Sequence, residues 1–213
     1  MADLTEYAYP SPIFFNNTFN NTKTHNNMAQ TVTCPEIKDI LASDECLENF
    51  GGLGVNVYIF NKADLTAPLK AEKNIYPALT SESFQSGKGL YKFECKENSQ
   101  GHTFESLGRR HGFKQQLDYV LESVNAESAE VARGLNNRDL GYIVQDGEKN
   151  IIVYNEQHKF EYASGGIKGD TGKKADDDRM VELSGTLQPT AYGRYEIPTP
   201  EGGWDSLLAS KKA

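Results

Sequence analysis

The stretch that decides the fold is Gly141-Tyr142-Ile143-Val144-Gln145, then Asp146-Gly147-Glu148-Lys149, then Asn150-Ile151-Ile152-Val153-Tyr154. Two runs rich in β-branched and aromatic residues flank a four-residue segment that contains Asp-Gly, which is typical of tight turns between antiparallel strands. The sequence therefore predicts a β-hairpin over residues 141–154.

Further segments on both sides of this hairpin show the composition or the two-residue alternation of strands. In Leu90–Cys95, for example, Tyr91, Phe93 and Cys95 share one face, while Lys92 and Glu94 occupy the other. The predicted additional strands are Val55–Phe60, Leu90–Cys95, Lys159–Ala163 paired with Met180–Leu187, and a final strand at about Gly193–Ile197.

Residues 113–124 fit a strand or a helix, because their apolar residues form a face at either period. We predict a strand, because Asn125 follows as a good N-cap and begins a better helix. That helix has Glu127 and Glu130 in its early turns, where the helix dipole favours acids, and ends at Gly134 and Asn136-Asn137. Its predicted inner side consists of Ala126, Ala129, Ala132 and Leu135.

The order of elements, strands followed by one short helix and more strands, predicts a mainly β fold. We expect a single antiparallel β-sandwich or barrel with one short flanking α-helix. The β-rich domain is predicted to span residues 31–213, with a short helix at Pro35–Asn49, a long loop at 164–179 and a C-terminal tail at 198–213.

Residues 1–30 differ from the rest, because Asn and Thr dominate them and only the patch Ile13-Phe14-Phe15 is apolar. Such a segment cannot bury a core by itself. Two interpretations stay open: a disordered leader, with Met28 as the natural first residue, or an arm that becomes ordered against a neighbouring subunit.

The composition restricts the classes of partner. The 213-residue chain has a formal net charge of −8, which argues against tight binding of free DNA. No apolar run approaches the roughly 20 residues of a membrane span, and we expect no signal peptide. The odd set of Cys34, Cys46 and Cys95 matches no zinc or redox spacing, so we expect reduced thiols and no cofactor.

Catalytic and metal-binding patterns fail to appear. None of the four histidines has a metal-ligand spacing, and His111 follows Arg109 and Arg110, which disfavour its protonation. Residues 166–174 resemble a phosphate-binding loop but have five residues between Gly166 and Gly172 and lack the hydroxyl after the lysine. Asp176-Asp177-Asp178 could bind calcium, yet the alternating acids of an EF-hand are absent. We expect no catalytic, cofactor-binding or metal site.

The loop Ser164–Arg179 is the best candidate for contact with another subunit, because sixteen residues exceed what a turn needs. Its charges are balanced, which suits docking that fixes register. A freely exposed loop is the alternative. Trp204 could anchor such a contact or pack into its own core. The candidate inter-subunit residues are Lys168, Asp170, Lys173, Lys174, Asp176, Asp177, Asp178, Arg179 and Trp204.

The segment Arg110–Leu187 resembles the tail tube proteins of bacteriophages and prophages. The resemblance covers about 80 to 100 residues and follows the order of elements. Its parts are His111-Gly112-Phe113, the helix ending in Gly134-Leu135-Asn136-Asn137, the strand Leu140–Val144, Gly165-Gly166 with Gly169–Gly172, Asp176–Arg179, and Gly185-Thr186-Leu187.

The resemblance implies a non-enzymatic virion protein of the viral tail, assembled in the cytoplasm of a bacterial host. Subunits would form homo-hexameric rings that stack into a tube, through which DNA passes without specific binding. Sheets that continue between subunits would cover their edge strands, and an acidic lumen would repel phosphates. Other tail proteins would be further partners. A phage decoration or baseplate protein, or another non-enzymatic binding module, is the alternative.

Overall fold

The computed structural model describes residues 52–122, 124–146, 149–174 and 178–209. The chain divides into two compact units, Met1–Leu47 and Glu48–Ala213, and every described residue belongs to the second. The predicted arm at 1–30 and the predicted helix at 35–49 lie outside the described residues.

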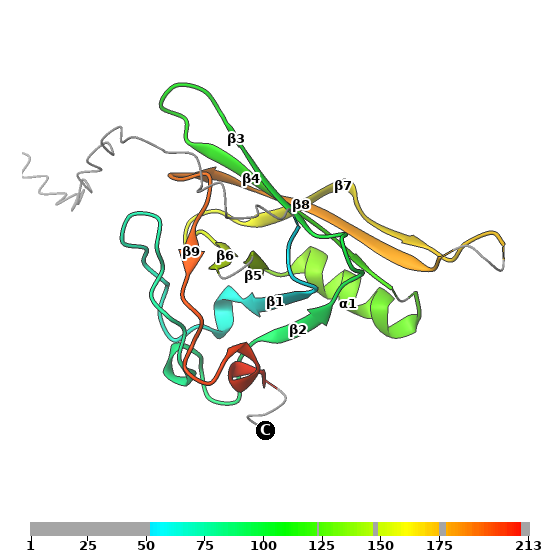
Figure 1. The fold of residues 1–213 in the computed structure, drawn as a ribbon, viewed down its shortest axis with the longest axis horizontal. Coiled ribbons are helices and arrows are strands. Elements are labelled where there is room, and N and C mark those ends of the chain that lie inside the picture. The colour runs from blue at the N-terminus through cyan, green and yellow to red at the C-terminus, as the bar shows by residue number, and fades with distance from the viewer. Residues whose placement is uncertain (1–51, 123, 147–148, 175–177, 210–213) are drawn as a thin grey trace, which may run out of the picture. The chain divides into compact units, whose positions relative to one another are not determined.

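The second unit is mainly β and consists of two antiparallel sheets in two layers with one α-helix (Figure 1). This confirms the predicted fold class. The first sheet has five strands in the order β2-β1-β5-β6-β9, and the second has four in the order β3-β4-β8-β7. The strands are β1 (Asn56–Asn61), β2 (Tyr91–Glu94), β3 (Gly101–Ser106), β4 (Phe113–Leu121), β5 (Leu140–Asp146), β6 (Lys149–Val153), β7 (Phe160–Asp170), β8 (Met180–Thr190) and β9 (Glu196–Ile197).

The predicted hairpin forms from β5 and β6, with register partners from Tyr142 opposite Val153 to Asp146 opposite Lys149. Its strands are buried on both faces, so their side chains supply both sides of the first sheet. One side packs against the second sheet, and the other packs against the long loops and the C-terminal segment. The first cluster includes Tyr142, Val144, Ile151 and Val153; the second includes Ile143, Ile152 and Tyr154.

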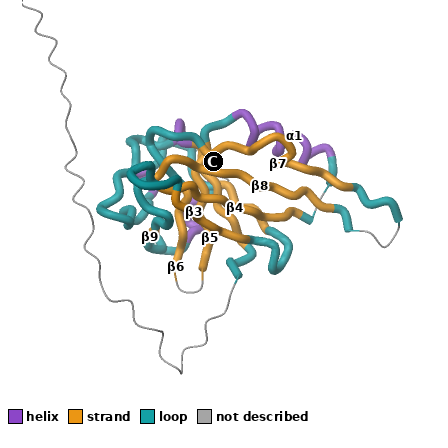
Figure 2. Tube along the Cα trace, turned by 90° about the horizontal axis from the view of Figure 1, so that it is seen from above, coloured by secondary structure: helices purple, strands orange, loops and turns teal. Residues whose placement is uncertain are grey.

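Strand β4 and helix α1 (Ala126–Asn137) form where the sequence predicts them. The predicted inner side of α1 is wrong for Ala126 and Ala129, which are exposed, because Val131 and Leu135 pack against the core instead. Gln115, Leu117 and Tyr119 are buried at alternate positions of β4, as expected for a strand with one inner face. The Asn125 side chain accepts a hydrogen bond from the Ser128 amide at 2.7 Å, which satisfies one free donor of the first helical turn. The helix lies beside β7 (Figure 1 and Figure 2) and buries Leu135.

Short 3-10 helices occupy Lys62–Asp64, Ser81–Ser83 and Trp204–Leu207. The first follows β1, where the Asn61 side chain accepts a hydrogen bond from the Ala63 amide at 3.2 Å. The second lies in the loop region between β1 and β2. The third lies near the C-terminal end of the described residues.

Several sequence predictions need correction. The loop predicted at Ser164–Arg179 is too long, because β7 continues to Asp170 through a bulge. The final strand is limited to Glu196–Ile197, since Tyr192 and Tyr195 turn into the aromatic cluster beside it. Strand β3 was not predicted at all. Tyr91 is exposed, because β2 is an edge strand whose first residue lies outside the core.

Candidate functional site

The two sheets differ in how their edges are covered. In the five-stranded sheet, β9 is covered by the loop between β1 and β2: the Tyr76 amide donates to the Glu196 carbonyl at 2.9 Å, and the Glu196 amide donates to the Asn74 carbonyl at 2.9 Å. At the other edge, Leu90 is the residue immediately before β2. Its backbone amide donates to the Leu207 carbonyl at 2.8 Å. Parts of the chain itself therefore cover β9, whereas at the other edge they pair only with Leu90, the residue before β2.

The four-stranded sheet has β3 and β7 at its edges, and neither has a second strand partner within the described ranges. An edge strand leaves a row of backbone donors and acceptors available to another strand. Strand β3 is exposed over Thr103–Ser106, and β7 is exposed over most of its second half. These two edges are the candidate assembly surface.

Strand β7 is interrupted by a bulge. Tyr162 lies opposite Gly185 and Ile167 lies opposite Leu183, so residues 163–166 stand against Ser184 alone. Gly166 is required there, because a Cβ atom would lie 2.4 Å from the Ser184 carbonyl oxygen. The bulge divides the free edge of β7 into two regular runs, residues 160–162 and 167–170.

The outer face of the four-stranded sheet is polar. The register places Glu105 opposite Lys114 and Lys168 opposite Glu182, and these pairs lie 2.9 Å and 3.9 Å apart. Five carboxylates share the face with two ammonium groups, so its balance is negative. The carboxylates are those of Glu105, Asp118, Glu161, Asp170 and Glu182, and the ammonium groups are those of Lys114 and Lys168. The uncharged side chains of this face include Thr103, Gln116, Val120, Ser184 and Thr186.

The predicted inter-subunit residues are distributed over β7 and the connection to β8. Lys168 and Asp170 belong to β7, and Asp170 accepts a hydrogen bond from the Gly172 amide at 2.9 Å. Lys173, Lys174 and Arg179 are exposed in the connection. Asp176 and Asp177 lie outside the described residues.

Asp178, at the far end of this connection, forms a hydrogen-bonded ion pair with Lys96, which follows β2 in the chain. This hydrogen bond lowers the pKa of the Asp178 carboxyl and raises that of Lys96. Both groups are solvent-exposed, so the pair positions the β7–β8 connection more than it stabilises the fold.

Trp204 is packed within its own chain and is 7% exposed. Its ring lies 5.8 Å from that of Tyr58, and its indole nitrogen donates to the Asn150 side-chain oxygen at 3.0 Å. Of the two interpretations of Trp204, own-core packing is the one observed. The expectation that Trp204 contacts another subunit is therefore corrected, because the side chain has almost no surface left for a partner.

Three tyrosine hydroxyls meet in the core between the sheets. The Tyr162 hydroxyl lies 2.8 Å from that of Tyr119 and 2.7 Å from that of Tyr142. Burial raises the pKa of Tyr162 to about 12, and it raises the pKa of the other two well above the ordinary value. Burial also raises the pKa of the nearby Cys95 thiol to about 11. These groups stay protonated at neutral pH, so they serve as hydrogen-bonding core residues.

A second buried polar group lies at the β3–β4 pair. Gln115 donates to the Thr190 hydroxyl at 3.3 Å and to the Tyr192 carbonyl at 3.0 Å. Its side-chain oxygen lies 3.4 Å from His102 Nε2, and burial lowers the pKa of His102. Sequence reasoning missed this group, because glutamine within an alternating strand carries no signal for its burial.

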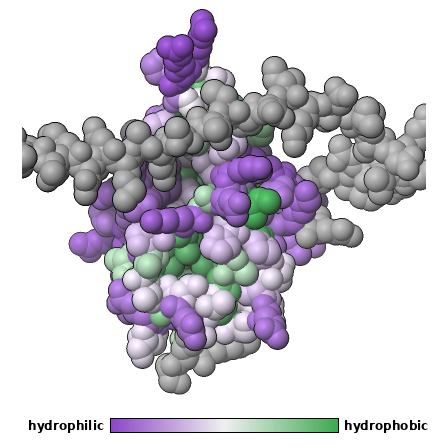
Figure 3. Space-filling view, turned by 90° about the vertical axis from the view of Figure 1, so that its left-hand side faces the viewer, coloured by the Kyte–Doolittle hydropathy of each residue, from purple (hydrophilic) through white to green (hydrophobic). Residues whose placement is uncertain are grey.

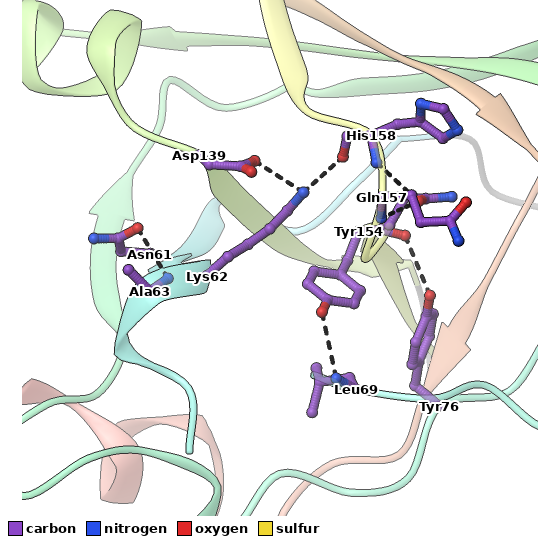
Figure 4. A network of polar contacts seen from close by, with 10 residues as sticks. Asn61, Lys62, Ala63, Leu69, Tyr76, Asp139, Tyr154, Gln157 and His158 are labelled. Carbon is purple, nitrogen blue, oxygen red and sulfur yellow. Dashed lines mark hydrogen bonds and ion pairs between the residues drawn. The ribbon is translucent and has the colours of Figure 1, made fainter. Parts of the chain in front are cut away.

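Lys62 joins three segments of the first sheet and its loops (Figure 4). Its ammonium group lies 2.8 Å from the Asp139 carboxylate, donates to the His158 carbonyl at 2.6 Å, and lies 5.3 Å from the Tyr154 ring centre. The Tyr154 hydroxyl accepts a hydrogen bond from the Leu69 amide at 3.3 Å. These contacts use the charge of Lys62 to hold the loops in place, as expected for a buried cation with a partner.

Two hollows lie at the β7 bulge. One, of about 380 Å³, lies between α1 and β7; the other, of about 200 Å³, lies beside Lys168 and Glu182. Their linings contain neither histidine nor cysteine.

Among the described side chains, no cluster of His, Cys, Asp and Glu is arranged to hold a metal ion. No helix in the described ranges is long and apolar enough to cross a membrane.

Comparison with known proteins found no relative of this chain. No family model, no curated protein and no solved structure matches this chain. The edges and faces of the two sheets are therefore the features of the chain that bear on its function.

Proposed function

We propose that this chain is a non-enzymatic structural subunit that assembles with copies of itself. The observation that carries this proposal is the pair of edges of the four-stranded sheet: within the described ranges β3 and β7 each have one strand partner, whereas β9 of the other sheet is also paired with residues 74–76. Strand β3 of one copy would pair with β7 of the next. Such a contact joins two different surfaces, and it closes into a ring when the rotation per subunit allows.

The assembly proposed is a hexameric ring, with rings stacked into a virion tail tube that conducts DNA. The polar outer face of the four-stranded sheet supports this proposal, because a ring formed through β3 and β7 would turn one sheet face towards its centre. The excess of carboxylates on this face would repel DNA phosphates and let DNA slide without binding. Assembly would take place in the cytoplasm of a bacterial host.

Mass and shape test the assembly. Light scattering on the purified full chain should give a species of six 23.7 kDa subunits, and negative-stain microscopy should show rings or tubes at high concentration. A chain that stays monomeric at every concentration and salt condition contradicts the proposal. A stable monomer or trimer that binds a different tail protein would support the second candidate, a decoration or baseplate module.

Disulfide trapping tests the proposed strand pairing. In a background with Cys34→Ser and Cys46→Ser, Thr103→Cys is combined with Glu161→Cys or with Lys168→Cys. Mild oxidation should then produce a ladder of cross-linked species, because each copy offers a different cysteine to each neighbour. The matched control pairs Thr103→Cys with Glu94→Cys, which lies in the other sheet and should give no ladder. A ladder in the control alone would refute β3-to-β7 pairing.

A further inference from the structure

The turn between β3 and β4, residues 107–112, is closed by its own backbone. The Leu107 amide donates to the Gly112 carbonyl at 2.9 Å, and the His111 amide donates to the Gly108 carbonyl at 3.2 Å. Arg110 has φ of 68°, in the left-handed region that the tight turn requires. The turn therefore presents its side chains from a defined backbone.

This turn carries a concentrated positive charge. Arg109, Arg110 and His111 are exposed, and none has a carboxylate partner among the described residues. Figure 3 shows the turn as the strongly hydrophilic projection at the top of the view. The whole chain has 22 Lys and Arg against 30 Asp and Glu, so a basic projection is unusual on it. Leu107, 37% exposed, adds an apolar contact beside the arginines.

An acidic surface lies at the opposite end of the same sheet. The turn precedes the pair Phe113–Thr190, whereas α1 begins shortly after the pair Leu121–Val181 at the other end of β4. Glu127 and Glu130 are exposed on the first turns of α1, one helical turn apart, and neither has a cationic partner in the described part of the chain. The nine residues of β4 separate the two regions by about 30 Å.

We propose that the basic turn of one copy docks end to end on the acidic start of α1 in a second copy. Arg109 and Arg110 bind Glu127 and Glu130 of that copy, and guanidinium groups suit this role because they bind carboxylates with two parallel hydrogen bonds. Exposed charge pairs of this kind fix register and weaken as salt rises. This inference rests on the proposed self-assembly and names the contact that stacks one ring on the next.

Charge reversal tests the contact on the full chain. Arg109→Glu with Arg110→Glu is compared with a matched control, Lys70→Glu with Lys73→Glu, which makes the same charge change on an exposed loop. At about 50 mM salt the control should form stacks like the unchanged chain, and the stacks should shorten at about 0.5 M salt. The arginine variant should form single rings, with at least about tenfold fewer stacks. Circular dichroism confirms that both variants are folded.

The compensating exchange completes the test. Adding Glu127→Arg and Glu130→Arg to the arginine variant should restore stacking, because the charges then attract with reversed sign. Equal stacking in the arginine variant and the control overturns the inference while leaving ring assembly intact. Failure of the exchange to restore stacks also overturns it. An unchanged chain that never assembles overturns both this inference and the proposed function.

Discussion

The indole nitrogen of Trp204 donates to the side-chain oxygen of Asn150 across 3.0 Å, which joins the C-terminal segment to the central hairpin. The amide group of Asn150 also donates to the Ile197 carbonyl at 3.2 Å and to the Thr199 hydroxyl at 2.9 Å. One buried asparagine thus connects β6, β9 and the segment that follows them. Trp204→Phe keeps an aromatic ring but leaves the Asn150 oxygen without its donor.

We expect Trp204→Phe to lower the free energy of unfolding by about 1–3 kcal/mol, since a buried acceptor loses its partner. Trp204→Ala should cost about 3–5 kcal/mol, because it also removes the ring. Urea unfolding measures both values. Tyr91→Phe, at an exposed tyrosine of β2, is the control and should stay within about 0.5 kcal/mol of the unchanged chain. A Trp204→Phe variant as stable as this control would show that the hydrogen bond contributes nothing.

The tyrosine cluster predicts an unequal response to removal of single hydroxyl groups. Tyr162 bridges Tyr119 and Tyr142, so Tyr162→Phe leaves two hydroxyls without the partner they share. We expect a loss of about 1–3 kcal/mol for Tyr162→Phe and about 1 kcal/mol for Tyr119→Phe, which leaves the Tyr142 contact in place. Chemical denaturation of the two variants compares them. Equal losses would argue against the bridging role.

The same cluster predicts a loss of stability in alkali. The pKa of Tyr162 is about 12 in the folded chain, against about 10 for an unfolded tyrosine, because burial disfavours the phenolate. The folded state therefore holds this proton more tightly, so its contribution to stability is complete below about pH 10 and is lost as the pH rises towards 12. The midpoint of urea unfolding should fall over this range, and it should fall less steeply in Tyr162→Phe. A constant midpoint from about pH 9 to 11.5 would contradict this account.

Much of this fold is predictable where one local signal dominates. The Asp-Gly hairpin, the Asn125 cap and the alternation in β4 each fix an element through neighbouring residues. Strand β3 carries no such signal, because Gly101-His102-Thr103-Phe104-Glu105-Ser106 has a single large apolar residue and is held by pairing with β4. Residues 165–172 contain four glycines, which favours a loop in the sequence. Three of these glycines nevertheless lie within β7.

The candidate surface was less predictable than the fold. Which edges are open depends on where loops far along the chain return, and the sequence does not show that residues 74–76 cover β9 or that Leu207 pairs before β2. The sequence did single out Arg109, Arg110 and His111, although as an unsuitable setting for a catalytic histidine. Their role as a projecting charge follows only from the turn that β3 and β4 form.

Gly141 and Gly101 differ in how much space surrounds the position of a Cβ atom, so one can serve as the control for the other. A Cβ atom on Gly141 in β5 would lie 2.3 Å from the Phe60 ring, whereas one on Gly101 in β3 would meet nothing within 4 Å. We expect Gly141→Ala to destabilise by about 1–3 kcal/mol through overpacking. Gly101→Ala should leave the stability unchanged or raise it by less than about 1 kcal/mol, since alanine suits a strand better. Thermal unfolding compares the two, and equal melting temperatures would rule out the steric explanation.

The bulge at residues 163–166 also limits what a foreign strand can do at β7. A foreign strand that pairs with this edge finds three residues in regular register, then the bulge, then four more residues in regular register. It therefore cannot form a long, continuous series of backbone hydrogen bonds. Short, interrupted edges resist the indiscriminate growth that produces amyloid-like fibres. The bulge thus limits pairing at this edge to short runs, whichever chain approaches it.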